Sequence, residues 1–389
     1  MPRRIASIDI LRGLIMIVMA LDHTRDYFHI TGVTADPLDP ATTTVGLYFT
    51  RWITHFCAPG FVFLSGLSAF LSAQKKTRQE AAVFLIKRGA WLVVAELTIV
   101  NLGLTFNPFF TFVILQVIWA IGWSMIILGL LSRYPFTLTL VIGLLLFFGH
   151  NAADYITFPQ QGRMVDLWRI LLTASGTIIV LDEHHLVGAF YAILPWTGIM
   201  LLGYCTGYLY RHSFVAVKRK QLLLMAGSSL IVLFVVLRLI NHYGDPVPWQ
   251  PQASALRQVF AFLNASKYPP SLDYACMTLG PLLIALALLE EVQSPWTRFV
   301  TVYGNVPFFY YILHFYLLHA LLVIFFYLTG YNNSQIIDNN PFFFRQAHFG
   351  YTLPVVYAIW AAVVLALYYP CRWFGQYKRT HTQWWLRYI

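Results

Sequence analysis

Charged side chains are scarce in this 389-residue sequence. Asp, Glu, Lys and Arg make up only 11% of it, against 58% apolar and 17% aromatic residues. A composition so poor in charge lies far outside the range of soluble domains. It predicts an integral membrane protein, and we expect an all-α fold, a polytopic bundle of membrane helices.

Cysteine is also rare, and its distribution excludes two classes of site. The four residues Cys57, Cys205, Cys276 and Cys371 occur singly and form no CxxC pair. Neither a zinc knuckle nor a disulfide framework is therefore expected. The cluster LDEHHL at 181–186 is better explained as an external loop than as a metal site, because adjacent residues rarely converge on one ion. We expect no metal.

A cleavable leader and a nucleic-acid partner are both disfavoured. The arginine-containing start MPRRIASIDILRGL is followed by the charged stretch LDHTRD, not by a small-residue cleavage site. This indicates a retained first helix. The net charge of +10 comes from short basic clusters between apolar runs, which is the pattern that sets membrane topology. Nucleic acid is therefore not an expected partner.

Apolar runs long enough to cross a hydrocarbon core of about 30 Å recur along the chain. We predict about ten spans, at 8–29, 47–73, 82–104, 109–131, 135–153, 187–210, 221–241, 271–290, 303–329 and 350–370. No internal repeat or separate soluble region stands out. The sequence thus predicts one transmembrane domain over residues 1–389, with both ends on one side.

The basic residues orient these spans. Of the 26 Lys and Arg residues, 17 fall in the set of segments that contains both chain ends. Two lie within spans, Arg12 and Arg238, and the opposite set holds the remaining seven, Arg25, Arg51, Arg163, Arg169, Arg257, Lys267 and Arg345. By the positive-inside rule, both termini are predicted to be cytoplasmic.

The first predicted span carries the ionisable residues that most need an explanation, because charge inside a membrane is costly. Asp9 and Arg12 are three residues apart and can form an ion pair on one face. The alternative is that this ion pair only anchors the helix and has no other function. His23 follows Arg12 by eleven residues, so it lies on nearly the same face about 16 Å away. Asp22 is rotated by about 100° from His23 and is either its support or an interfacial carboxylate.

Three of the other histidines within predicted spans are candidates for a functional site. His55 in the second span lies at a depth similar to that of His23, which makes a shared site geometrically feasible, although a lone buried histidine is more often a structural residue. His314 and His319 in the ninth span are about 140° apart on a helix, so they are not expected to bind one ion together. We interpret them as lining a cavity for substrate, with a structural role as the alternative.

Two other motifs have a structural and a functional interpretation. KYPPSLDY at 267–274 places two prolines before a new span, as at a rigid helix entry. Lys267, Tyr268 and Ser271 are also candidates to line an acceptor cleft. In FVFLSGLSAFL, the small residues Ser65, Gly66 and Ser68 are explained by close helix packing.

The order of these motifs resembles that of known transmembrane acyltransferases. RGLIMIVMALDH places a histidine eleven residues after the arginine of an Arg-Gly pair, and APGFVFLSG follows in the next span. This is similar to the opening of the acyltransferase-three family, in which such a helix ends in an essential histidine. The resemblance implies a catalytic role for His23.

A broader resemblance is carried by RWITHFCAPGFVFLSG, YAILPWTGIMLLGY, SKYPPSLDYACMTLGP, FFYYILHFYLLH and CRWFGQYKRTHTQWWLRYI. These segments are similar to bacterial membrane proteins grouped with the catalytic domain of heparan-alpha-glucosaminide N-acetyltransferase. The resemblance implies a bacterial inner-membrane enzyme that moves an acetyl or longer acyl group from cytoplasmic acyl-CoA to an amine or hydroxyl of an external glycan-like acceptor. Residues 30–46 contain no histidine to match the one in the animal enzyme.

These inferences combine into one hypothesis and one rival. Arg12, supported by Asp9, would bind acyl-CoA, the expected co-substrate, while His23, with His55 and Asp22 nearby, would act as general base or carry the acyl group. The rival is a proton-coupled secondary transporter that uses the buried histidines and acids as a relay. The lipid bilayer is an expected partner in both cases, and a homodimer stays open as the oligomeric state.

Overall fold

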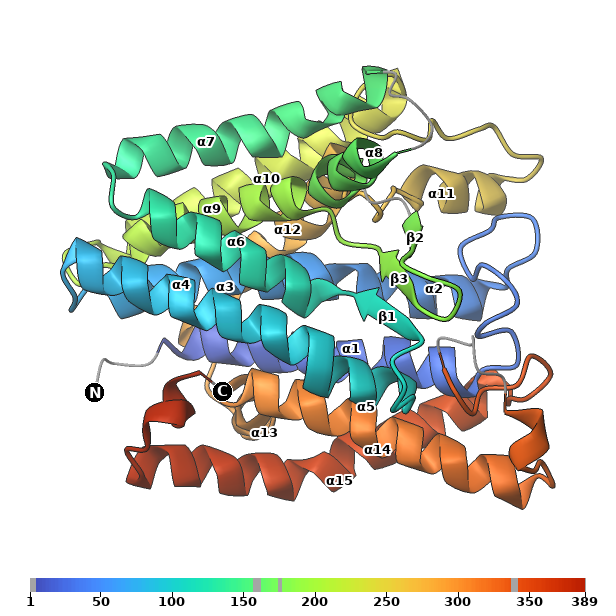
Figure 1. Cartoon of the computed structure of the whole chain (residues 1–389). Helices are drawn as coiled ribbons and strands as arrows, with labels where there is room; N and C mark the ends of the chain where they lie inside the picture. Colours follow the sequence, from blue (N-terminus) through green and yellow to red (C-terminus); the bar gives the residue numbers. More distant parts are fainter. Residues whose placement is uncertain (1–4, 157–161, 174–176, 337–341, 389) are drawn as a thin grey trace.

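A computed structural model describes residues 5–156, 162–173, 177–336 and 342–388. Most of these residues lie in helices that run roughly along one direction (Figure 1). The helices are α1 (Ala6–Phe28), α2 (Val45–Ile53), α3 (Cys57–Ala73), α4 (Arg78–Ala95), α5 (Asn101–Thr105), α6 (Val117–Leu131), α7 (Phe136–Gly149), α8 (Arg163–Trp168), α9 (Ile193–Thr206), α10 (Ala216–Ile240), α11 (Ala255–Leu263), α12 (Leu272–Leu288), α13 (Pro295–Gly304), α14 (Pro307–Leu328) and α15 (Leu353–Thr380). The expected all-α bundle is confirmed.

Six helical segments in the described part of the chain have the length and apolar composition of membrane spans. They are Val45–Ala73, Phe136–Tyr155, Ala216–Ile240, Leu272–Glu291, Pro307–Leu328 and Leu353–Thr380, and Val117–Leu131 is a shorter apolar helix. The protein is therefore a multi-pass membrane protein, while the count of about ten spans stays a prediction. Arg3 and Arg4, two of the basic residues used for orientation, lie outside the described residues.

Helix α1 lies in the middle of the bundle, between α3 and the group α13, α14 and α15 (Figure 1). Its contact with α13 is close because each of the two helices presents a glycine to the other. A Cβ atom on Gly13 would overlap the carbonyl of Val300, and one on Gly304 would overlap the carbonyl of Asp9. Small residues that let helix backbones approach are typical of membrane proteins. The glycines thus fix α1 against α13.

A small sheet lies at the end of the bundle opposite to the start of α1 and the end of α15 (Figure 1). Its strands are β1 (Phe112–Leu115), β2 (Thr177–Val180) and β3 (Leu186–Ala189), in the order β1-β3-β2. β1 pairs with β3 in parallel, and β2 pairs with β3 antiparallel. Residues far apart in the sequence therefore meet at one mouth of the bundle.

These strands correct two of the predicted spans. The segments 109–131 and 187–210 were expected to be helical from their starts, but each begins as a strand, and α6 and α9 start only at Val117 and Ile193. A short apolar run such as FVIL fits a buried strand as well as a helix. The choice depends on backbone pairing with a distant segment, which local hydropathy does not contain.

Two further predicted spans are interrupted. The span at 303–329 is divided between the end of α13 at Gly304 and the start of α14 at Pro307, since proline favours the first turn of a helix. The span at 82–104 contains a π-helical turn at Glu96–Val100 between α4 and α5. Such turns are often found at functional sites, and this one places Glu96 in the protein interior.

Candidate active site

A cavity of about 280 Å³ lies next to the sheet and contains His23. We call it the His23 cavity. Its lining includes five charged residues besides His23, and these are Asp22, Arg25, Asp26, Arg51 and Lys267. Aromatic side chains complete the wall, among them Phe190, Tyr191, Tyr268, Tyr311 and Phe342. The cavity therefore combines one imidazole with both signs of charge and an aromatic wall.

Asp26, one turn after His23, is the acid that approaches the imidazole. His23 Nδ1 lies 4.0 Å from Asp26 Oδ2, and Arg25 Nη2 lies 2.6 Å from the other carboxylate oxygen of Asp26. An i, i+3 pair on a helix faces the same side. The spacing could have revealed Asp26 in the sequence, but it was not selected there.

Asp22, predicted as a support for His23, is held instead by two arginines. Its Oδ1 accepts from Arg25 Nη2 at 3.1 Å, and its Oδ2 accepts from Arg51 Nη1 at 3.1 Å. Arg51 also donates to Thr54 Oγ1 at 2.8 Å. Asp22 therefore joins the end of α1 to the end of α2 and fixes two cationic side chains in the cavity wall.

The histidines of the ninth span and His55 lie behind this wall. The rings of His23 and His314 are 5.3 Å apart between centroids, while His319 stacks on Phe106 and its Nδ1 lies 2.9 Å from the Leu104 carbonyl oxygen. His55 is buried, and its Nδ1 lies 3.1 Å from the Trp52 carbonyl oxygen. Its ring faces Tyr274 at 5.3 Å. Of the four predicted histidines, only His23 lines the cavity.

Of the three residues predicted to line an acceptor cleft, two line the His23 cavity and one lies behind it. Lys267 and Tyr268 line the His23 cavity, with the Lys267 ammonium 5.0 Å from the centre of the Tyr268 ring. Ser271 is fully buried and caps α12, where its Oγ accepts from the Tyr274 amide at 3.1 Å. This agrees with the expected helix entry. Ser271 supports the loop that presents Lys267 and Tyr268.

A buried acidic cluster fixes the same loop from behind. Asp245 accepts hydrogen bonds from the Ser266 amide at 2.8 Å and from the Ser266 hydroxyl at 2.6 Å. Arg238, which is completely buried, lies 3.5 Å from Asp245 and 3.6 Å from Asp273. Its guanidinium also donates to the carbonyls of Phe262, Ala261 and Asn264. Arg238, a basic residue inside a predicted span, thus has a structural role.

Glu96 supports the cavity from the π-helical turn. Its Oε1 accepts from the backbone amide of Gln116 at 2.9 Å, and Gln116 lines the His23 cavity. The side chain is fully buried, and its Oε2 has no hydrogen-bond partner among the described residues. Its position inside an apolar stretch is the sequence signal that marks it as a candidate.

A second cavity of about 230 Å³ contains Arg12 at the other end of α1. We call it the Arg12 cavity. The predicted ion pair is confirmed, since Arg12 Nη1 lies 3.1 Å from Asp9 Oδ1. The same guanidinium donates to the Gly304 carbonyl at 3.1 Å and to Ser68 Oγ at 2.7 Å. Ser68 therefore does more than permit close packing, whereas Gly66 does meet α9 directly, where a Cβ would overlap the Met200 carbonyl.

The Arg12 cavity contains two further cationic side chains, Arg88 of α4 and Lys378 of α15. Arg88 Nε is buried and has no hydrogen-bond partner among the described residues. Serine side chains of α3 add hydroxyl groups, and these are Ser65, Ser68 and Ser72. This combination of guanidinium, ammonium and hydroxyl donors fits phosphate oxygens.

The two cavities follow the same four helices, α1, α3, α6 and α14. Their linings nearly meet on two of them, because Phe61 and Ser65 of α3 are four residues apart, and Phe308 and Tyr311 of α14 are three residues apart. At 1.5 Å per residue, the linings are separated there by about 5 to 6 Å along the helix. Within the described residues, no group of three His, Cys, Asp or Glu side chains is placed to bind a metal ion.

Comparisons with known proteins identify a family for this chain. Residues 4–237 match the family described as "Heparan-alpha-glucosaminide N-acetyltransferase, catalytic". A search among curated proteins finds no match. The matched region holds His23, Asp26 and Arg51 as well as Arg12 and Arg88. Since it covers more than half of the chain, the protein belongs to the family of heparan-alpha-glucosaminide N-acetyltransferase catalytic domains, which are membrane proteins of acetyltransferase-like function.

Proposed function

We propose that this protein transfers an acyl group from acyl-CoA, bound in the Arg12 cavity, to an amine or hydroxyl of an acceptor in the His23 cavity. The observation that carries the proposal is the alignment of the two cavities along α1, α3, α6 and α14. One cavity offers donors for phosphate, and the other offers a histidine. A donor with phosphates at one end and a reactive thioester at the other fits this pair of sites.

The Arg12 cavity would hold the phosphates of CoA. Arg12 is already oriented by Asp9, Ser68 and the Gly304 carbonyl, so little side-chain freedom is lost when an anion binds. Arg88 would add a buried guanidinium, and Lys378 an ammonium. The distance of about 16 Å between Arg12 and His23 along α1 is close to what the extended pantetheine arm must cover.

In the His23 cavity, the imidazole would act as a general base. It would take the proton from the acceptor nitrogen or oxygen as that atom attacks the thioester carbonyl. The carbon–sulfur bond then breaks, and the proton passes from His23 to the CoA thiolate. Asp26 would stabilise the imidazolium formed in between, and the cations Arg51 and Lys267 would stabilise the negative oxygen. Transfer through an acyl-histidine is the alternative route.

The walls of the His23 cavity support a polar, ring-containing acceptor such as a sugar. Tyr191 and Tyr268 offer flat aromatic faces, and Asp22 and Arg51 offer groups that can hydrogen-bond hydroxyls. We place this mouth on the external side of a bacterial inner membrane, with both chain ends in the cytoplasm. This orientation is supported by the bias of basic residues towards the segments that hold the chain ends.

Reconstituted protein supplied with radiolabelled acetyl-CoA and a panel of amino sugars tests the proposal. His23→Ala should lower transfer to a small residual rate, while Arg12→Ala should mainly weaken acyl-CoA binding. His212→Ala is a matched control, because His212 lies outside both cavities. Unchanged turnover in His23→Ala would exclude the proposed base, and an unaltered acyl-CoA affinity in Arg12→Ala would exclude the proposed phosphate site.

The same preparation distinguishes the enzyme from a proton-coupled transporter. Mass spectrometry of the purified protein should detect retained CoA or acyl-CoA. In sealed vesicles without acyl-CoA, addition of an acceptor should cause no change in internal pH. Acidification that depends on the acceptor alone would favour the transporter and contradict acyl transfer.

A further inference from the structure

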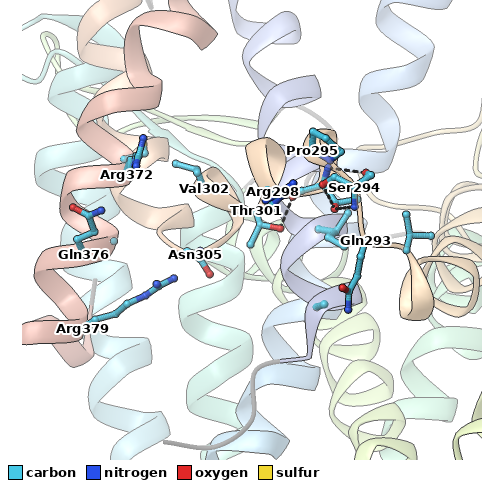
Figure 2. A pocket seen from close by; sticks show the side chains of 16 residues that line it. Gln293, Ser294, Pro295, Arg298, Thr301, Val302, Asn305, Arg372, Gln376 and Arg379 are labelled. Atoms are coloured by element: carbon cyan, nitrogen blue, oxygen red, sulfur yellow. Dashed lines mark hydrogen bonds between the residues drawn. The ribbon is translucent and has the colours of Figure 1, made fainter.

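A third cavity, of about 720 Å³, lies at the end of the bundle where α1 begins and α15 ends. We call it the Arg372 cavity. Figure 2 shows Arg372, Gln376 and Arg379 along α15 on one side, with Arg298 and Thr301 of α13 across from them. The proposed acyl transfer makes no use of this cavity.

The Arg372 cavity is positively charged and contains no acid. Its lining includes three arginines, Arg298, Arg372 and Arg379, and no Asp or Glu. None of the three forms an ion pair with another residue in the described ranges. Other basic residues at this end do have acidic partners, since Arg219 pairs with Glu290 at 2.5 Å and Lys220 with Glu291 at 3.7 Å. The cavity thus has positive charge that the described part of the protein does not neutralise.

The two arginines of α15 project from one helix face into this space. They are seven residues apart, which corresponds to nearly two full turns and about 10 Å along the axis. Gln376 lies between them, and Asn305 and Thr301 also line the cavity, where the Thr301 hydroxyl already donates to the Thr297 carbonyl at 2.7 Å. Such an array of guanidinium and amide groups matches the oxygens of a phosphate group.

The position of the cavity points to a ligand that lies at the membrane surface. Arg372 follows directly after the apolar part of α15, and its neighbour Trp373 is 60% exposed. Tyr369 on α15 and Trp296 at the start of α13 are also exposed. Exposed tryptophan and tyrosine side chains are typical of the boundary between lipid tails and headgroups. The rim of the cavity therefore lies at the depth of lipid headgroups.

We propose that the Arg372 cavity binds the phosphate of an anionic phospholipid headgroup. Basic pockets between membrane helices are known to hold such headgroups. Arg372 and Arg379 contact the phosphate from α15, and Arg298 contacts it from α13. The acyl chains of the lipid then extend along the exposed apolar side of α15.

Gly375 offers a way to block the cavity without changing its charge. It lines the cavity between Arg372 and Arg379. A Cβ added there would have Val306 Cγ1 as its nearest neighbour at 3.8 Å, so the helix has room for a side chain. Gly375→Leu should fill part of the space that the headgroup occupies while preserving the fold of α15.

The experiment measures binding of dihexanoyl-phosphatidylglycerol to the purified full chain in a non-ionic detergent, with dihexanoyl-phosphatidylcholine and acetyl-CoA as separate probes. Arg372→Gln/Arg379→Gln should weaken phosphatidylglycerol binding about 30-fold, at roughly fivefold for each arginine. Gly375→Leu should weaken it as well. Affinity for acetyl-CoA should stay unchanged in both variants. Arg78→Gln/Arg133→Gln is the matched control, because it removes two cations that do not line the cavity.

Four results would overturn the proposal. Unchanged phosphatidylglycerol affinity in the double variant would mean that the arginines bind no headgroup. A loss confined to acetyl-CoA would assign the cavity to the soluble phosphates of CoA instead. An equal loss of affinity for phosphatidylglycerol and for acetyl-CoA would show nonspecific attraction to positive charge. An equal loss of phosphatidylglycerol affinity in the control variant would show the same. These outcomes are independent of the proposed reaction, since the assay requires no turnover.

Discussion

Replacement of Asp26 by asparagine should reduce the rate of acyl transfer through its effect on His23. When His23 accepts a proton, its positive charge lies 4.0 Å from the Asp26 carboxylate. Two unit charges at that separation attract each other by about 4 kcal/mol at an effective dielectric constant of about 20. Asp26→Asn removes this attraction but preserves the shape of the side chain.

The full value is an upper bound, because Arg25 already lies 2.6 Å from the same carboxylate. If Arg25 neutralises about half of the carboxylate's charge, the loss is about 2 kcal/mol, or about 30-fold in rate. The loss should appear in kcat, since the imidazolium exists only during the reaction. KM for acyl-CoA should change little, because the proposed phosphate site lies at the other end of α1.

A double-mutant cycle in the reconstituted transfer assay tests this reasoning. Asp26→Asn should cost about 30-fold in the wild-type background and almost nothing when His23 is already alanine, because it acts through the imidazole. Asp166→Asn, at an acid that does not line the cavity, serves as the charge control. Equal losses in both backgrounds would refute the coupling, as would wild-type kcat in Asp26→Asn.

Three predictions concern stability, each measured by thermal unfolding in detergent. Arg238→Met should destabilise the protein by about 3 to 5 kcal/mol, because the buried carboxylates of Asp245 and Asp273 lose their counter-charge. Arg257→Met, at an exposed position, should leave the melting temperature unchanged. Equal melting temperatures of the two variants would contradict a structural role for Arg238. Glu96→Ala should cost about 1 to 3 kcal/mol, since the partly buried Gln116 amide loses its acceptor, whereas Glu96→Gln should retain most of the stability. Identical losses in the two variants would show that this amide has another acceptor. Gly203→Ala should cost at least about 1 to 3 kcal/mol, because the added Cβ would overlap the Phe63 carbonyl. Gly149→Ala, at a glycine with open space around it, should leave the stability unchanged. Unchanged stability in Gly203→Ala would mean that α3 and α9 can move apart.

Local spacing predicted much of what lies within a single helix. The Asp9–Arg12 ion pair follows from two residues three apart, and the shared face of Arg12 and His23 follows from a separation of eleven. The helical bundle itself follows from composition, because a lipid-exposed backbone must satisfy its own hydrogen bonds. These features need no knowledge of which helices are neighbours.

Features that depend on contacts between distant segments were not predictable in this way. Arg51 meets Asp22 across 29 residues, and no periodicity in either helix implies that contact. The strands at 112–115 and 186–189 look like helical runs until their pairing is known. His55 is predicted to share the depth of His23, but its ring faces Tyr274. A shared depth does not fix the direction in which a helix points a side chain.

Helix α13 connects the two cavities that we assign to different ligands. The carbonyl of Gly304 accepts the hydrogen bond from Arg12, and the next residue, Asn305, lines both the Arg12 cavity and the Arg372 cavity. A ligand that shifts this short turn acts on both sites at once. Thermodynamic linkage then requires reciprocity: whatever factor a headgroup applies to the affinity for acyl-CoA, acyl-CoA must apply to the affinity for the headgroup. The lipid composition of the surrounding membrane would thereby change the affinity of the protein for a water-soluble donor.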